Sequence, residues 1–315
     1  MHPFRFGVVL ESVRDERALR ETVRRAESAG YATVLVRDHF VAEPFGPQLA
    51  PLTALATVAA HSSSLRLGTL VIDNDFRHPA LLAKEIATLD LLSGGRVELG
   101  LGAGWLAAEY QQTGIPFDSP GTRIARLEES ITILKGLLRG NSVTFHGEHY
   151  QVTALENFPQ PVQAPHPPIL LGGGAKRMLS LAGREADIIS VLVTSVASGV
   201  QLDSIDEWSS SRLAEKVGWI RDAAADRFES IELNLFPDIL VTDDHITGAR
   251  QFAEARGWDV SPEIVLEMPA VLIGSVDRIA EKLLTQRQNL GFSYFVLSDT
   301  DLEAATPLVS RLVGT

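Results

Sequence analysis

Short apolar runs alternate with amphipathic runs along nearly the whole chain, and this alternation limits the folds available to it. Each apolar run is followed by a stretch with helical spacing, which is typical of βα units and a parallel sheet. Eight such units predict an α/β fold of the TIM (β/α)8 barrel type, with the active site at the C-terminal ends of the strands. The eight runs lie at residues 6–11, 33–36, 65–72, 97–101, 169–171, 187–193, 231–241 and 293–298.

Two segments lengthen this predicted barrel, which we expect to form a single domain over residues 1–315. An insertion of about residues 105–165 follows the fourth strand and holds a helix over 123–138, a hairpin centred on Gly147 and a proline-rich tract. After the sixth strand, the small and polar residues 195–204 predict a mobile loop over the barrel mouth. A short extra strand or an ordered loop is expected at 269–275.

The apolar positions of the inserted helix can be interpreted in two ways. They recur at helical spacing, so they form one apolar face, which either packs inside the chain or forms a dimer contact. The residues of this face are Ile124, Leu127, Ile131, Leu134 and Leu138.

Charge and composition exclude several classes of function. The net charge of −12 and the isoelectric point near 5.1 argue against nucleic acid or an anionic membrane as a partner. Cysteine is absent, which excludes disulfides and thiolate ligands. No motif for a metal hydrolase, a serine hydrolase or a P-loop occurs, so no metal site is expected. Without a signal peptide or a long apolar run, we expect a cytoplasmic protein.

The stretch GLGAGW, residues 100–105, raises a specific alternative. Gly102, Gly104 and Ala107 fit the GxGxxA form of the dinucleotide-binding fingerprint, directly after a predicted strand. That fingerprint normally opens its domain, whereas three βα units precede this one. The order of the units therefore argues against a dinucleotide fold.

Polar and glycine-rich residues follow the predicted strands, which fits a ligand site at the barrel mouth. The sequence GGGAKR places three glycines ahead of a helix, where backbone N–H groups and the helix N-terminus favour an anion. Lys176 and Arg177 add positive charge, although a tight connection with solvated basic side chains is the alternative. The candidate phosphate site consists of Gly172, Gly173, Gly174, Ala175, Lys176 and Arg177.

Several longer stretches resemble the bacterial luciferase-like superfamily, in the right order over nearly the whole chain. They are VRDHF, RHPALLAKEIATLDLLSGGRVELGLGAGW, GTRIARLEESITILKGLL, PPILLGGGAKRML and VLIGSVDRIAEKLL. The resemblance is closest to the branch that uses the deazaflavin coenzyme F420, while other members use FMN. It implies a TIM barrel with an insertion after the fourth strand, a small-molecule substrate and a homodimer. It also implies that GLGAGW is a tight turn where Gly102 and Gly104 let the backbone approach a flat cofactor ring.

The resemblance also implies roles for individual residues. His39 would lie beside the reactive ring and exchange a proton, while Asp38 would fix its tautomer or cap the turn. Leu70 and Val71 would be joined by a cis peptide bond that supports the ring, and Asp73 would hydrogen-bond the ring edge.

Two features near the glycine turn concern the substrate. Trp105 stands where relatives that oxidise glucose 6-phosphate have a glutamate, and Glu43 or Pro44 stands where they have a tryptophan, which argues against sugar-phosphate oxidation. Trp105 would instead stack on the substrate or the cofactor, or serve packing alone. Glu109 is interpreted as a surface or helix-start carboxylate.

These observations predict an oxidoreductase that transfers hydride between coenzyme F420 and a small organic substrate. The first alternative is an FMN-dependent monooxygenase that uses reduced flavin and oxygen. A second is a barrel that binds flavin or deazaflavin without catalysis. A third, a cofactor-free isomerase acting on a phosphorylated substrate, lacks an evident lysine or glutamate base at a strand end.

Overall fold

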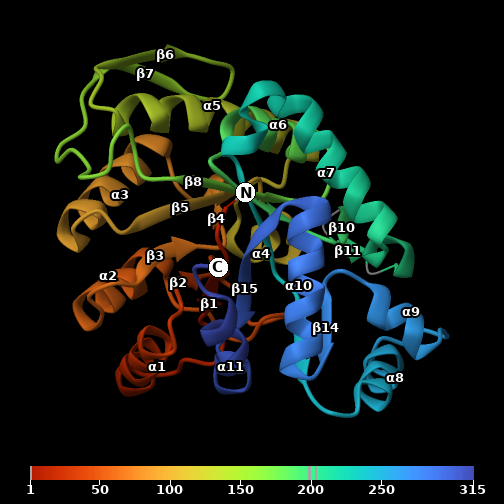
Figure 1. Cartoon of the computed structure of the whole chain (residues 1–315). Coiled ribbons are helices and arrows are strands. Elements are labelled where there is room, and N and C mark those ends of the chain that lie inside the picture. The colour runs from red at the N-terminus through yellow and green to blue at the C-terminus, as the bar shows by residue number, and fades with distance from the viewer. Residues whose placement is uncertain (1, 198–199, 203) are drawn as a thin grey trace.

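Eight parallel strands close into a barrel, as the sequence predicts (Figure 1). The computed structural model describes residues 2–197, 200–202 and 204–315. Strand β1 pairs with β2 and β15, and β3 pairs with β2 and β5, so the sheet has no free edge. Around the barrel the strands are β1 (Arg5–Val9), β2 (Thr33–Val36), β3 (Arg66–Thr69) with its continuation β4 (Ile72–Asp73), β5 (Val97–Gly102), β8 (Ile169–Gly173), β9 (Ile188–Val191), β12 (Glu232–Leu235) and β15 (Phe292–Ser298).

Helices surround the barrel, and several of them begin after a residue whose side chain caps the helix N-terminus. The Asp15 carboxylate caps the first helix by accepting the N–H of Ala18, and Gly94 ends the third helix with a φ of 70°. The seventh helix is flanked by short 3₁₀ turns at both ends, Ile205–Trp208 and Ala225–Ser230. The helices of the barrel wall are α1 (Glu16–Ser28), α2 (Pro51–His61), α3 (Pro79–Ser93), α6 (Lys176–Glu185), α7 (Ser210–Ala224), α8 (His245–Ala255), α10 (Val276–Leu290) and α11 (Leu302–Leu312).

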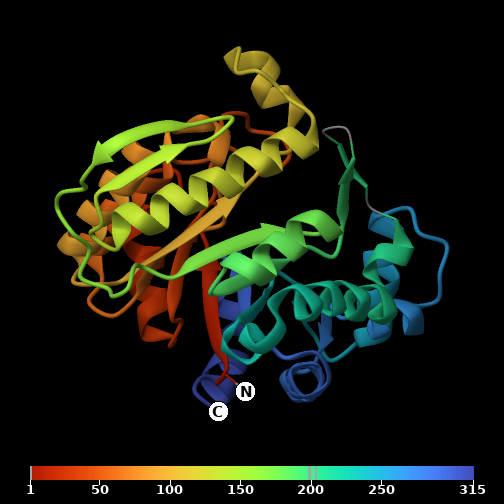
Figure 2. The same cartoon turned by 90° about the horizontal axis from the view of Figure 1, so that it is seen from above.

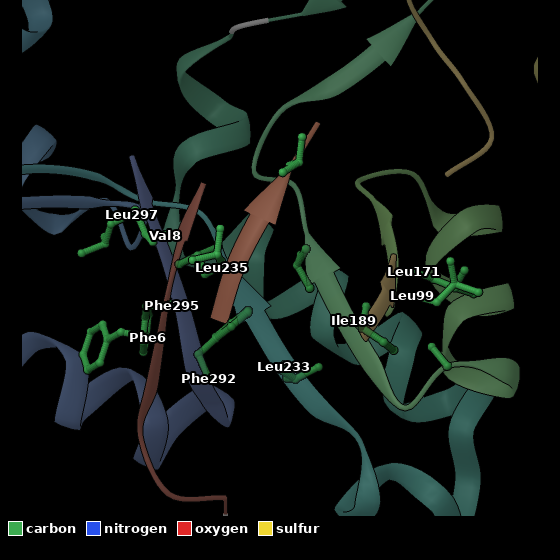
Figure 3. Packing of buried hydrophobic residues seen from close by; sticks show 14 of the residues in the cluster. Phe6, Val8, Leu99, Leu171, Ile189, Leu233, Leu235, Phe292, Phe295 and Leu297 are labelled. Atoms are coloured by element: carbon green, nitrogen blue, oxygen red, sulfur yellow. The ribbon is translucent and has the colours of Figure 1, made fainter. Parts of the chain in front are cut away.

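Alternate residues of the strands serve two separate cores, because successive side chains of a strand point to opposite faces. One set, which includes Phe6, Leu99 and Phe295, packs with apolar residues of the surrounding helices (Figure 3). The other set fills the lumen and consists of Val9, Leu35, Leu170, Ile188, Tyr294 and Val296.

A buried network of charges occupies the N-terminal end of the lumen. Arg5 lies 2.5 Å from Glu98 and 2.6 Å from Glu232, and its guanidinium stacks 3.7 Å from the centre of the Tyr294 ring. Arg66 contacts the same Glu98 carboxylate at 2.5 Å. Burial alone would lower the pKa of Arg5, but the surrounding anionic groups raise it above its usual value. The network therefore carries fixed opposite charges at the end of the barrel away from the strand C-termini.

The insertion after β5 folds against one side of the barrel (Figure 2). It comprises α4 (Ala107–Thr113), α5 (Pro120–Leu138) and the predicted hairpin of β6 (Val143–His146) and β7 (Gln151–Leu155). Glu129 of α5 accepts the N–H groups of Glu148, His149 and Tyr150, which fastens the hairpin turn to the helix.

The apolar face of α5 packs inside the chain. Leu127, Ile131, Leu134 and Leu138 are buried, and α5 lies against α3. Of the two interpretations of this face, internal packing therefore agrees with the structure.

One predicted segment differs in detail from the structure, and another is confirmed. The apolar run 231–241 is not one strand, because Phe236 and Pro237 separate β12 from β13 (Asp238–Val241). β13 pairs in parallel with β14 (Val271–Gly274), which confirms an extra strand within 269–275; α9 (Pro262–Glu267) precedes it.

The segment expected to be a mobile loop contains two short strands. β10 (Ser195–Ala197) and β11 (Val200–Leu202) pair in antiparallel fashion. Residues 198–199 and 203 of the expected loop lie outside the described residues. Among the helices of the described part of the chain, none has the length and apolar character needed to cross a membrane.

The lumen network generates a prediction about stability. Replacing buried Glu98 by alanine leaves the partly buried Arg5 and Arg66 without their shared carboxylate, and we expect a loss of about 3–5 kcal/mol in the free energy of unfolding. Glu303→Ala breaks an exposed ion pair with Arg25 and should cost about 0–1 kcal/mol. Urea unfolding followed by circular dichroism measures both variants. Equal effects would show that the lumen pair contributes no more than a surface pair.

Candidate active site

The parallel strands bring the predicted site residues to one rim of the barrel. Asp73 of β4 is in register with Gly102 of β5, and Leu101 of β5 is in register with Leu171 of β8. The segments that follow β2, β4, β5 and β8 therefore meet at the C-terminal rim, where His39, the GLGAGW turn and the GGGAKR stretch were expected.

His39 is held by a buried carboxylate. Its Nδ1 lies 3.0 Å from Oε2 of Glu109, in the first turn of α4, and the Glu109 side chain is only 2% exposed. The other oxygen of Glu109 accepts the N–H of Phe40 at 2.5 Å and of Val41 at 3.4 Å. A carboxylate beside Nδ1 favours the tautomer that carries its proton there, which leaves Nε2 as the ring nitrogen available for exchange.

This contact corrects two sequence-based expectations. Glu109 does stand at a helix start, but it is buried rather than on the surface, and it holds the imidazole in place of Asp38. Asp38 instead accepts a hydrogen bond of 2.5 Å from Arg77 and one of 3.2 Å from the backbone N–H of Asp73. Its carboxylate thus ties the end of β2 to the segment around β4.

Asp73 points into the protein beneath the glycine turn. The Tyr110 hydroxyl donates to its carboxylate at 3.0 Å and lies 3.1 Å from the carboxylate of Asp75. Burial, aided by the negative charges of Asp75 and Asp38, raises the pKa of Asp73 to about 7. Gly104 has a φ of 72°, and a Cβ at this position would overlap the Tyr110 hydroxyl. The Asp73 oxygens are therefore already engaged on the side away from the rim.

A small apolar floor lies across the neighbouring strand ends. The Leu70–Val71 peptide bond is cis, as the family resemblance implies. A Cβ on Gly102 would lie 2.6 Å from the Val71 side chain, and one on Gly172 would lie 3.3 Å from it. The two glycines thus make room for Val71, and both Leu70 and Val71 remain partly exposed. The floor thus consists of two apolar side chains and the backbone of two glycines.

The end of β8 and the start of α6 form a donor set for an anion. Gly172 and Gly173 end strand β8. Gly174 and Ala175 connect this strand to α6, which begins at Lys176. No side chain caps the N-terminus of α6 by a hydrogen bond. Lys176 and Arg177 are exposed, and neither forms an ion pair with another described residue. Free backbone N–H groups and two cations suit a phosphate or another anionic group.

Two aromatic rings flank His39, and one of them, that of Phe45, was not predicted from the sequence. The centre of the Phe45 ring lies 5.0 Å from that of His39, while Trp105 lies 6.3 Å from both rings. Phe45 stands in the long connection between β2 and α2, where no periodic pattern indicated a role. Within the described ranges, no group of histidine and acidic side chains has an arrangement that could hold a metal ion.

The Glu109 contacts predict a specific loss of stability. Glu109→Ala removes the acceptor of the His39 ring and of the Phe40 and Val41 N–H groups, so the free energy of unfolding should fall by at least about 1–3 kcal/mol. Glu109→Gln keeps one carbonyl acceptor and should recover part of the loss. Exposed Glu156→Ala is the matched control. If Glu109→Ala and Glu156→Ala unfold at the same temperature, the Glu109 carboxylate does not anchor the segment of His39, Phe40 and Val41.

The raised pKa of Asp73 predicts a pH dependence of stability. Between about pH 4 and pH 7 the folded protein keeps a proton on Asp73 that the unfolded chain releases, so this group lowers stability as pH rises through that range. Asp73→Asn mimics the neutral form, and its advantage over the wild type should grow up to about pH 7 and then level off. Melting curves from pH 4 to pH 8 test this, with exposed Asp226→Asn as control. Parallel profiles for wild type and Asp73→Asn would contradict it.

Comparison with known proteins assigns the chain to a family. The model of the luciferase-like monooxygenases matches residues 1–208. An F420-dependent glucose-6-phosphate dehydrogenase of Amycolatopsis mediterranei is 34% identical over 174 residues, which cover 54% of this chain and 52% of that protein. An FMNH2-dependent dimethylsulfone monooxygenase of Pseudomonas putida is 31% identical over 170 residues, which cover 53% of this chain and 46% of that protein. The matched segment thus spans about half the length of these relatives.

A solved structure shows the same fold over the whole chain. The coenzyme F420-dependent tetrahydromethanopterin reductase of Methanopyrus kandleri superimposes with a TM-score of 0.77 and covers 99% of both chains, at 19% identity. The relatives include both deazaflavin-dependent and flavin-dependent oxidoreductases. With the barrel, the rim geometry and the match over residues 1–208, the chain belongs to the luciferase-like monooxygenase family of oxidoreductases.

Proposed function

We propose that this protein is an oxidoreductase that uses coenzyme F420 and transfers hydride between the deazaflavin and a small organic substrate. The observation that carries this proposal is the His39–Glu109 pair, because it provides a proton-exchanging nitrogen at the C-terminal rim, where TIM barrels have their active sites. When bound, the deazaflavin would supply hydride chemistry at its C5 atom. The protein would supply position, a proton and an anion site.

His39 would handle the proton that accompanies a change between hydroxyl and carbonyl. Since Nδ1 is paired with Glu109, the Nε2 atom would accept a proton from a substrate hydroxyl or return it to a carbonyl oxygen. Glu109 would hold the imidazole in position during that exchange, because its Oε2 atom lies 3.0 Å from Nδ1.

The remaining rim residues fit the two ends of such a cofactor. Val71, with Gly102 and Gly172 beneath it, offers the apolar floor on which a planar ring would rest. The GGGAKR segment would bind the phosphate and the acidic tail, since Lys176 and Arg177 are exposed and the helix that they begin has no side-chain cap.

An FMN-dependent monooxygenase is the second candidate. Its support is the FMNH2-dependent relative, which matches with nearly the same identity as the F420-dependent one, 31% against 34%. The floor and the anion site would also accept the ring and phosphate of FMN, but FMN lacks the acidic tail that Lys176 and Arg177 would bind. A barrel that binds either cofactor without catalysis uses the same contacts but does not need the proton of His39.

A titration of the cofactor-free protein separates these candidates. We expect saturable binding of F420, followed by its fluorescence, and at least tenfold weaker binding of FMN. Lys176→Ala combined with Arg177→Ala should weaken F420 binding at least tenfold, whereas Arg24→Ala on the exposed side of α1 should leave it unchanged.

The outcomes are distinct. Preference for FMN would favour the monooxygenase, and absence of binding by both cofactors would contradict both assignments. The His39→Asn variant should retain F420 binding. If the protein is the proposed enzyme, this variant should no longer reduce or oxidise F420 with any substrate that is active with the wild type. If the protein only binds the cofactor, the substitution should have no further effect.

A further inference from the structure

The side of the rim that carries His39 is lined by aromatic rings. Phe45 and Trp105 flank the imidazole at 5.0 and 6.3 Å between ring centres. Both rings are partly exposed, so they present apolar surface next to the nitrogen that would exchange a proton. A substrate whose reacting carbon lies beside His39 would therefore contact two aromatic rings.

The two arginines next to His39 in the fold, Arg37 and Arg77, are each paired with a carboxylate of the protein. Arg37 stacks over Phe45 at 4.3 Å and pairs with Glu11 at 2.7 Å. Arg77 pairs with Asp38 at 2.5 Å. Each guanidinium is thus matched by a carboxylate within the protein, and a phosphorylated substrate would have to displace that carboxylate.

A neighbouring cavity extends this surface and is acidic. It has a volume of about 490 Å³ and lies beyond the ends of β1, β12 and β15. Phe236 lines it and also stacks 5.0 Å from Arg37, which connects the cavity to the Phe45 side of the rim. Glu11, Asp238 and Asp301 also line it, so a substrate that reached into it would meet carboxylates.

The opposite side of the rim has the reverse character. Lys176 and Arg177 are exposed and have no ion-pair partner among the described residues. Lys176 and Arg177 at the start of α6 thus have no carboxylate partner among the described residues, whereas Arg37 and Arg77, beside the rings and His39, each have one. This separation divides the rim into an anion-binding half and an apolar half.

We propose that the substrate is a neutral molecule that presents an apolar ring or hydrocarbon group beside its reacting carbon. This inference rests on the proposed function, since it places the cofactor's anionic groups at the start of α6 and leaves the apolar half for the substrate. Phe45 is the residue that determines this preference, because it lies between His39 and Arg37 and contacts both.

Calorimetric titration of the F420-saturated protein tests the inference with four small probes. Benzyl alcohol is neutral and apolar; benzyl phosphate and benzylamine add a negative or positive charge to the same ring, and glucose is neutral but polar. We expect saturable binding of benzyl alcohol and at least tenfold weaker binding of the other three. Tighter binding of a charged probe or of glucose would overturn the proposal, as would no saturable binding of benzyl alcohol up to its solubility limit.

Two variants of Phe45 and a matched control complete the test. Phe45→Ser should weaken benzyl alcohol binding at least tenfold, Phe45→Leu less so, and exposed Phe158→Ser less than twofold. F420 affinity, measured first on each variant, should stay within twofold of the wild type, which shows that the variant is folded. If the wild type does not bind F420, the result counts against the proposed function. If Phe45→Ser binds F420 normally and binds benzyl alcohol as tightly as the wild type does, only the present inference is overturned.

Discussion

Closure of the parallel sheet is the constraint on which the rest of the structure depends. The pairings of β1 with β15 and of β3 with β5 close the sheet, and all pairings around the barrel are parallel. The connections that follow the strands therefore emerge at one rim. The lumen has room for only a few layers of side chains. Tyr294 and Leu35 occupy its middle, the Arg5 network its N-terminal end, and Val71 approaches the C-terminal rim.

The charged side chains at the two ends of the barrel differ in how completely they are paired. At the N-terminal end, Arg5 and Arg66 share the buried carboxylate of Glu98, so each charge is fixed by a partner. At the C-terminal rim the pairing is uneven, since Arg37 and Arg77 near His39 are matched while Lys176 and Arg177 have no partner among the described residues. A ligand with an anionic tail and an uncharged reacting end therefore has one preferred orientation on this rim.

Periodicity predicted the barrel well because each strand is defined locally by its own apolar residues. The run 231–241 was the exception, since apolar residues continue through Phe236 and Pro237 while the chain leaves the barrel there. Strand ends predicted the place of His39, and the family resemblance supplied the cis bond at Leu70–Val71. The contact partner of His39 could not be predicted in the same way. Glu109 lies 70 positions further along the chain, and only the packing of α4 against the end of β2 brings the two together.

The hairpin of the insertion is held by a side chain that lies outside it. Three consecutive amides of its turn converge on the single carboxylate of Glu129, so the turn is shaped by α5 more than by its own residues. The side chains of Glu148 and His149 are free to vary, provided that their backbone keeps this geometry. During evolution this turn can thus accumulate substitutions without disturbing the barrel, and in the laboratory it offers a place to attach a fluorescent label or a short peptide far along the chain from His39.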